Sequence, residues 1–115
     1  MSLSEFYGSE PTKPYAKRIQ DANPNVFRSF RQFALQGHTP PKGSFVYACL
    51  TNDLSLTLGK ADDQMSEVID DVVLYLNNCI PIGCWGSEDT IQNWEGLTSD
   101  MSEDVAVKIA KDSGM

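Results

Sequence analysis

The stretch Ala61–Trp94 has the sequence ADDQMSEVIDDVVLYLNNCIPIGCWGSEDTIQNW. Its first half repeats apolar side chains at intervals of three and four residues, which is the spacing of one face of an α-helix. Two aspartates at the start of the repeat favour a helix N-terminus, and Pro81 forbids continuation. The pattern predicts a central helix over Asp62–Cys79. Its expected apolar face consists of Met65, Val68, Ile69, Val72, Val73, Leu76 and Ile80.

The other face of this predicted helix is acidic. It carries the carboxylates of Asp63, Glu67, Asp70 and Asp71. Like charges four residues apart repel slightly, so this face gains no helix stability from pairing. We interpret it as a solvated face or as a surface for a basic protein partner, with imitation of nucleic-acid phosphates as one form of the second. A divalent cation fits less well, because a row of carboxylates on a helix is not the wrapped oxygen cage that calcium needs.

The residues that follow, Cys79–Trp94, predict a tight turn and then a short helix. Ser87 is placed to cap that helix, and two acids follow it in the first turn, where the helix dipole favours negative charge. Trp85 lies in the turn. It either fills the core beside apolar neighbours such as Ile82, or it is an exposed anchor for a partner.

Upstream, two helices are separated by Asn23. The first is expected over roughly 14–21, with Thr12 as its cap. The second is expected over Pro24–Gln36, with Asn23 as N-cap, proline at the first position and Gly37 as the C-terminal stop. Its predicted apolar face consists of Val26, Phe27, Phe30, Phe33 and Ala34.

A third upstream helix is expected over 44–58, with an apolar surface that extends to Leu54 and Leu58. Two polar residues interrupt it, and such residues compete for backbone hydrogen bonds in a helix interior. Its start has a lysine, free N–H groups and no acid in the first turn, which favours an anion or a nucleotide phosphate. The candidate ligand-binding residues of this segment are Lys42, Gly43, Ser44, Asn52 and Asp53.

The two ends of the chain complete the expected fold. A last helix is predicted over Asp100–Lys111, with Ser99 as N-cap and with Met101, Val105 and Ile109 on one face. Residues 1–13 are expected to form an N-terminal arm, either mobile or docked through its aromatic side chains. No period-two alternation occurs, so we predict an all-α fold. It is a compact single-domain bundle of five or six short helices over 14–115, with the mobile arm over 1–13.

Composition limits the function classes. The chain of 115 residues has a net charge of −7, and no apolar run approaches the ~20 residues of a membrane span. Residues 1–42 carry +3 and residues 43–115 carry −10. The acidic body argues against direct binding of nucleic acid or anionic membranes. We expect the basic segment to pack across the acidic body, within one molecule or between subunits. Three cysteines at wide spacings indicate reduced thiols and a cytoplasmic protein.

Catalysis and metal binding find little support in the sequence. The single histidine, His38, has no serine, cysteine or carboxylate near it that suggests a triad. The three cysteines and His38 do not have the compact spacing of structural zinc sites. We therefore predict a non-enzymatic protein without a metal or cofactor.

The order of several short motifs resembles a group of small uncharacterised proteins encoded in phages, prophages and bacteria. The motifs are Gly43-Ser44-Phe45, Asn52-Asp53-Leu54, Ala61-Asp62, Tyr75-Leu76-Asn77-Asn78, Pro81, Cys84-Trp85-Gly86-Ser87 and Trp94. They span about residues 43–94. The resemblance implies a phage-type or bacterial origin and a compact helical unit, and it brings no assigned activity.

These observations favour a small acidic accessory protein that binds a macromolecular partner, one with a basic surface. The candidate partner-binding residues are Asp63, Glu67, Asp70, Asp71 and Trp85. The alternatives are a small-molecule or nucleotide binder that uses the helix start at Lys42, and a DNA-mimic inhibitor of a nucleic-acid-binding protein. We also keep a homo-oligomer as an alternative. A pocket lined by Cys49, Asn52, Asp53 and the 81–87 turn would favour the small-molecule binder, whereas a smooth acidic ridge with no pocket would favour the macromolecular binder.

Overall fold

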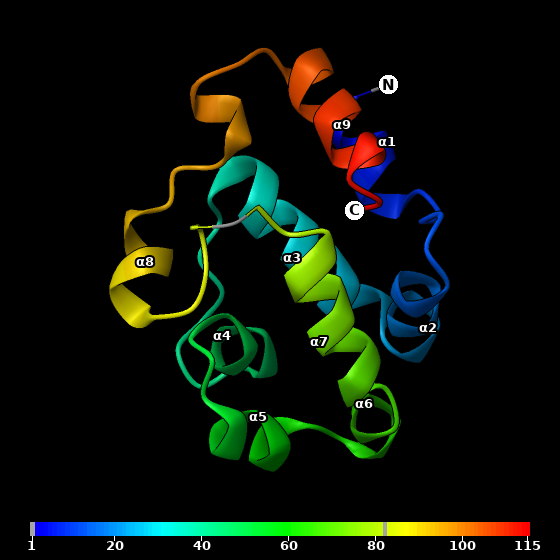
Figure 1. Ribbon diagram of the computed structural model, residues 1–115, viewed down its shortest axis with the longest axis vertical. Coiled ribbons are helices and arrows are strands. Elements are labelled where there is room, and N and C mark those ends of the chain that lie inside the picture. The colour runs from blue at the N-terminus through cyan, green and yellow to red at the C-terminus, as the bar shows by residue number, and fades with distance from the viewer. Residues whose placement is uncertain (1, 82) are drawn as a thin grey trace.

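The computed structural model describes residues 2–81 and 83–115, without the side chain of Leu54. Within these residues the regular structure is helical, with nine α-helices and one short 3₁₀-helix, and five of the α-helices have seven residues or more. The elements are α1 (Leu3–Gly8), α2 (Pro14–Ala22), α3 (Pro24–Gln36), α4 (Phe45–Leu50), α5 (Leu54–Lys60), α6 (Asp63–Ser66), α7 (Ile69–Asn78), α8 (Glu88–Asn93), η1 (Leu97–Ser99) and α9 (Glu103–Asp112), as Figure 1 shows. The predicted all-α class is confirmed. The Cα radius of gyration of 13.0 Å is that of a compact domain of this length.

Helix α3 begins and ends where its local sequence predicts. The Asn23 side chain accepts hydrogen bonds from the backbone N–H groups of Asn25 and Val26, and Gly37 ends the helix with φ of 70°. Its aromatic face is fully buried. Helix α3 packs against α1, α2, α4, η1 and α9, so it holds the central position that the sequence assigned to Asp62–Cys79. The expected cap of α2 is wrong, because Lys13 takes the N-cap position in place of Thr12.

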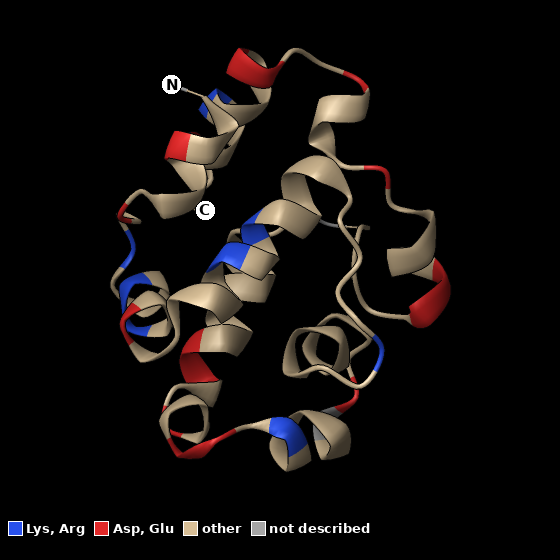
Figure 2. Cartoon of the chain, turned by 180° about the vertical axis from the view of Figure 1, so that it is seen from behind, with Lys and Arg blue, Asp and Glu red and all other residues tan. Residues whose placement is uncertain are grey.

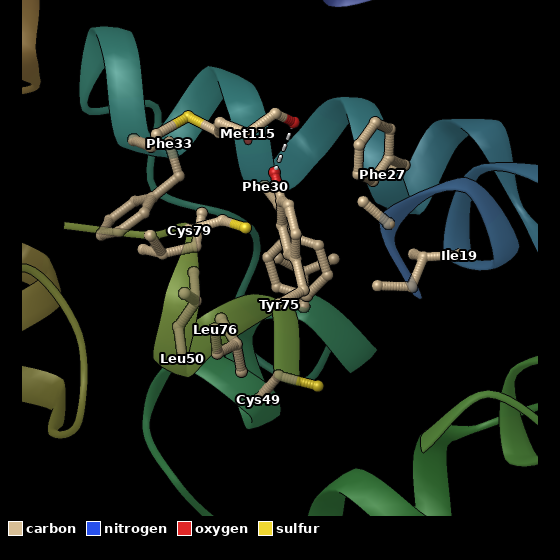
Figure 3. Packing of buried hydrophobic residues seen from close by; sticks show 14 of the residues in the cluster. Ile19, Phe27, Phe30, Phe33, Cys49, Leu50, Tyr75, Leu76, Cys79 and Met115 are labelled. Atoms are coloured by element: carbon tan, nitrogen blue, oxygen red, sulfur yellow. Dashed lines mark hydrogen bonds between the residues drawn. The ribbon is translucent and has the colours of Figure 1, made fainter. Parts of the chain in front are cut away.

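Tyr75 of α7 is the side chain through which α7 meets this aromatic face. Its ring lies 5.3 Å from that of Phe27 and 5.9 Å from that of Phe30, between ring centroids. Figure 3 shows Tyr75 among these rings, with its hydroxyl donating a hydrogen bond to the backbone oxygen of Met115. Burial raises the pKa of Tyr75, which keeps the phenol neutral as a donor.

The predicted helix over Asp62–Cys79 is divided into α6 and α7. At the division the Val68 N–H bonds to the carbonyl oxygen of Met65, three residues earlier, and Val68 has φ of −117° and ψ of 18°. A turn of this kind rotates the chain only slightly more per residue than an α-helix does. The apolar spacing therefore passes through the break almost unchanged, and the sequence pattern cannot reveal it.

The predicted helix over 44–58 is divided as well, at its two polar residues. Asn52 takes a left-handed conformation with φ of 60°, which asparagine tolerates better than most residues. Asp53 then caps α5 by accepting a hydrogen bond from the N–H of Leu56. The expected burial of Leu58 is wrong, since its side chain is 55% exposed. Leu54, the other expected core residue of this segment, has its side chain outside the described part.

Helix α9 presents a different face to the core from the one predicted. Its N-cap is Ser102, not Ser99, which lies in η1. Val105 and Ile109 are exposed, and the buried residues are Ala106, Val107 and Ala110. The small alanine side chains let α9 approach α1 and α3 closely, which the larger Val105 face would prevent.

The N-terminal arm docks through its aromatic residues, one of the two arrangements expected from the sequence. Phe6 and Tyr7 of α1 are buried. Arg31 of α3 holds this arm, with only 1% of its surface exposed. Its Nη1 donates to the carbonyl oxygens of Phe6 and Ser9 at 2.6 and 2.7 Å, and its Nε donates to the Met115 oxygen at 3.0 Å. The guanidinium also lies over the rings of Phe6 and Phe27, at 4.3 and 4.5 Å from their centroids.

We predict that Arg31→Met lowers the free energy of unfolding by about 3 kcal/mol or more, because several buried carbonyl oxygens lose their donor. Urea denaturation measures the loss, and trypsin cleavage at Lys13 reports release of the arm. Arg28→Met is the control. That guanidinium is exposed and lies 5.6 Å from the Tyr7 centroid, so we expect a loss below about 1 kcal/mol. Equal losses in the two variants would contradict the assignment.

Gly37 and Gly96 mark a second constraint, where the end of α3 crosses the chain that leaves α8. A Cβ on Gly37 would meet the Glu95 backbone carbon at 2.6 Å, and one on Gly96 would meet the Gln36 carbon at 2.5 Å. Both residues also have positive φ.

We predict that Gly37→Ala lowers the free energy of unfolding by more than about 3 kcal/mol. Gly43→Ala, at φ of 88° with open space around its Cβ, should cost only the roughly 1–2 kcal/mol of the left-handed conformation. Urea midpoints for the two variants test the difference.

Candidate functional site

The expected acidic face has three exposed carboxylates and not four, because Asp71 is buried in an ion pair. Asp71 is buried, and its Oδ1 accepts a hydrogen bond from Arg18 Nε at 2.9 Å and lies 2.8 Å from Nη2 in the same ion pair. This pair joins α2 to α7. Asp71 is therefore a structural residue, and its assignment to a free partner-binding face is corrected. The pair brings one basic residue of the N-terminal segment against the acidic body, as the sequence led us to expect.

The other three acids of that face remain exposed, on α6, in the following turn and at the start of α7. They are Asp63, Glu67 and Asp70. The neighbouring Asp62 is exposed too, although its side chain caps α6 through the N–H of Met65. Figure 2 shows this edge of the molecule, with acidic residues following the short link from α5 into α6 and α7. The edge is a local source of negative potential beside α5.

The helix start at Lys42, Gly43 and Ser44 contacts a carboxylate of the protein itself. Ser44 caps α4 by accepting from the N–H of Tyr47 at 3.1 Å. Lys42 Nζ lies 3.2 Å from Glu88 Oε1, and the Tyr47 hydroxyl donates to the same oxygen at 2.8 Å. These contacts lower the pKa of Glu88 and raise that of Lys42, so both stay charged. An incoming anion would compete with Glu88 for the lysine.

Asn52 and Asp53 lie at the opposite end of α4, so the five candidate ligand-binding residues do not form one site. The carboxylate of Asp53 is committed to the α5 cap. Asn52, by contrast, lines a pocket. This pocket has a volume of about 90 Å³ and lies between α5, α7 and the turn that follows α7. Its lining residues are Cys49, Asn52, Thr57, Ile69, Val72, Val73, Leu76, Asn77 and Trp85.

We call this pocket, together with the exposed apolar side chains on its two helices, the α5–α7 groove. Cys49, Val72 and Leu76 are buried lining residues and give the pocket an apolar floor. On α5, Leu56 and Leu58 are 36% and 55% exposed. On α7, Val73 and Leu74 are 49% and 45% exposed. Of these four side chains Val73 lines the pocket itself, and Leu56 and Leu58 flank the lining residue Thr57, so apolar surface is exposed on both helices of the pocket.

Trp85 is half-buried at the groove. It therefore combines the two roles that the sequence left open, a side chain that fills the core and an exposed anchor for a partner. It packs against the core and also lines the pocket. Ile82, its expected neighbour, lies outside the described residues. Trp94, the other tryptophan, has a structural role, because its indole N–H donates to the carbonyl oxygens of Phe33 and Ala34.

The sequence anticipated part of the lining, because Cys49, Asn52 and the 81–87 turn, which contains Trp85, were named together for a pocket. It placed Val73 in the core and did not predict the walls formed by α5 and α7. The run Val72-Val73-Leu74 contains a usable signal, because three consecutive residues of a helix span about 200° and cannot all face one core. The groove itself depends on where α5 lies after the chain turns at Asn52. That turn brings Thr57 of α5 to the same pocket as α7.

The thiols of the chain are buried and protonated. Burial raises the pKa of Cys49 and of Cys84 to about 12, and it also raises that of Cys79. A neutral thiol is a poor nucleophile. Among residues 2–81 and 83–115, no three His, Cys, Asp or Glu side chains are grouped closely enough to hold a metal ion.

Comparisons of the chain with protein-family models, with curated proteins and with solved structures found no match. Within the described part, no helix combines the length and the apolar character needed to cross a bilayer.

We predict that the protein loses stability at alkaline pH. The Cys49 and Cys84 thiols stay protonated to about 12 in the folded state, whereas exposed thiols ionise near 9.0. The unfolded state therefore holds fewer protons above pH 9, and stability falls as pH rises from there towards 12. Each thiol contributes at most about 1.4 kcal/mol per pH unit. Urea midpoints at pH 8, 9 and 10.5 measure the fall. Cys49→Ala should have a shallower slope than wild type, and equal slopes would contradict the prediction.

Proposed function

We propose that this protein is a non-enzymatic, cytoplasmic accessory protein that binds another protein through the α5–α7 groove. The observation that carries the proposal is an apolar pocket with exposed leucine and valine side chains on both of its helices. Apolar clusters of this kind with a polar rim are typical of protein-binding surfaces. The half-buried Trp85 adds an aromatic side chain of the type enriched in binding hot spots.

A small-molecule binder is the second candidate, because the pocket contains Cys49, Asn52 and Trp85, much as the sequence required for that alternative. Its volume argues against a nucleotide. Pockets for drug-sized ligands have roughly 300–1,000 Å³, and this one has about 90 Å³. The basic helix start at Lys42 is also absent from its lining, so no cation of that segment is available to a phosphate in the pocket.

A matched pair of valines tests the proposal. Val73 and Val105 are 49% and 48% exposed, both on ten-residue helices, and only Val73 lines the pocket. We expect affinity capture from the cells that encode the protein to retain a partner on wild type and on Val105→Asp. Val73→Asp should reduce that retention at least tenfold, the cost of a charge in an apolar contact.

Circular dichroism and urea denaturation confirm that both variants fold before capture is compared. Equal retention by Val73→Asp and Val105→Asp would contradict the groove as the binding site. A metabolite that raises the melting temperature of wild type but not of Val73→Asp, with no protein captured, would favour the small-molecule binder.

A further inference from the structure

We infer that the occupant of the α5–α7 groove is a cationic amphipathic helix of a partner protein, which inserts one aliphatic side chain into the pocket. This inference rests on the proposed function and specifies the partner's chemistry. It is argued from the size of the pocket, the placement of exposed apolar side chains and the charge beside them.

The pocket is of a size for a single side chain. Its volume of about 90 Å³ is below the ~150 Å³ of a protein cavity that accepts benzene, so it has room for one apolar side chain of modest size. The floor of Cys49, Val72 and Leu76 offers apolar contacts, and Asn52 and Asn77 place amide groups at the lining. One leucine-sized side chain can enter while the backbone that carries it stays outside.

Exposed apolar side chains also lie on both helices that line the pocket. On α5, Leu56 and Leu58 flank the lining residue Thr57, and on α7 the exposed Val73 lines the pocket itself. A helix with apolar residues at i, i+3, i+4 and i+7 has a stripe wide enough to touch both walls while its central residue enters the pocket. An extended strand has no unpaired sheet edge to join here, because the described residues form no strand.

The charge beside the groove selects a cationic helix. Asp63, Glu67 and Asp70 are exposed and follow one another at intervals of four and three residues. Asp70 lies one helical turn before Val73 and Leu74, so this carboxylate lies beside the exposed apolar side chains of α7. Lysine or arginine residues that flank the apolar stripe of the partner would lie against these carboxylates.

A second copy of this chain does not meet the requirement. Its net charge is −7, and three of its basic side chains form ion pairs within the molecule. Arg18 pairs with Asp71, Lys42 pairs with Glu88, and Lys17 pairs with Glu10 and Asp21. Two acidic edges would repel each other at such an interface.

The test uses the full chain, labelled with ¹⁵N, and two helical peptides of 16 residues that share one leucine stripe. At all positions outside the leucine stripe, one peptide has lysine and its counterpart has glutamate. We expect the lysine peptide to shift the Val73 amide and the Trp85 indole signals and to leave the Trp94 indole unchanged. Its affinity should exceed that of the glutamate peptide at least tenfold in 50 mM salt and should weaken as salt is added.

A triple variant, Asp63→Asn, Glu67→Gln and Asp70→Asn, should lose about tenfold in affinity for the lysine peptide, as expected for three exposed ion pairs. The control is Glu95→Gln, Asp100→Asn and Asp104→Asn, which removes the same charge from an exposed region near α9 and η1. We expect the control to bind like wild type at 150 mM salt.

Three results would overturn the inference: equal binding of both peptides, equal losses in the two triple variants, or signal shifts centred on Val105 and Ile109. The cell-derived partner separates this inference from the proposed function. If that partner is lost with Val73→Asp but retained by the Asp63, Glu67 and Asp70 variant, only the cationic occupant is wrong. If Val73→Asp retains it, the groove itself is wrong.

Discussion

The buried guanidinium of Arg31 is the interaction on which the packing of this protein depends. A cation in the interior is costly unless its N–H groups are satisfied, and Arg31 satisfies them with backbone carbonyl oxygens of the N-terminal arm and of Met115. The rings of Phe6 and Phe27 cover its faces. Burial lowers the pKa of Arg31, yet an arginine remains charged. One side chain of α3 thereby joins segments from both ends of the chain.

The same organisation explains why the α5–α7 groove lies away from this centre. Helix α3 packs against α1, α2, α4, η1 and α9, whereas α5 packs mainly on α4. The charges follow a similar division. Arg18 and Lys42 pair with Asp71 and Glu88, whereas none of the ion pairs among the described residues involves Asp63, Glu67 or Asp70. An apolar pocket beside the acidic edge of α6 and α7 is the combination that a cationic amphipathic segment would complement.

Local signals were predictable where a single residue or its near neighbours decide the structure. The caps at Asn23 and Ser87 are confirmed, as is the C-terminal stop at Gly37. The helix breaks at Asn52 and Val68 were not predicted, and for different reasons. At Asn52 the polar pair was visible but was assigned to a helix interior. At Val68 an i to i−3 turn preserves the apolar spacing.

The sequence by itself determined the all-α class, both ends of α3, the start of α8 and the acidic character of the molecule. The class and the helix ends depend on residues within a few turns of one another, and the charge depends on composition alone. Tertiary structure alone decided that Asp71 is buried against Arg18, that α9 buries alanines in place of Val105, and that Val73 borders a pocket. Each of these depends on residues brought together from distant parts of the chain, as Arg18 and Asp71 are. Apolar periodicity predicts which side chains favour burial. Which of them are buried depends on the elements that pack against each helix.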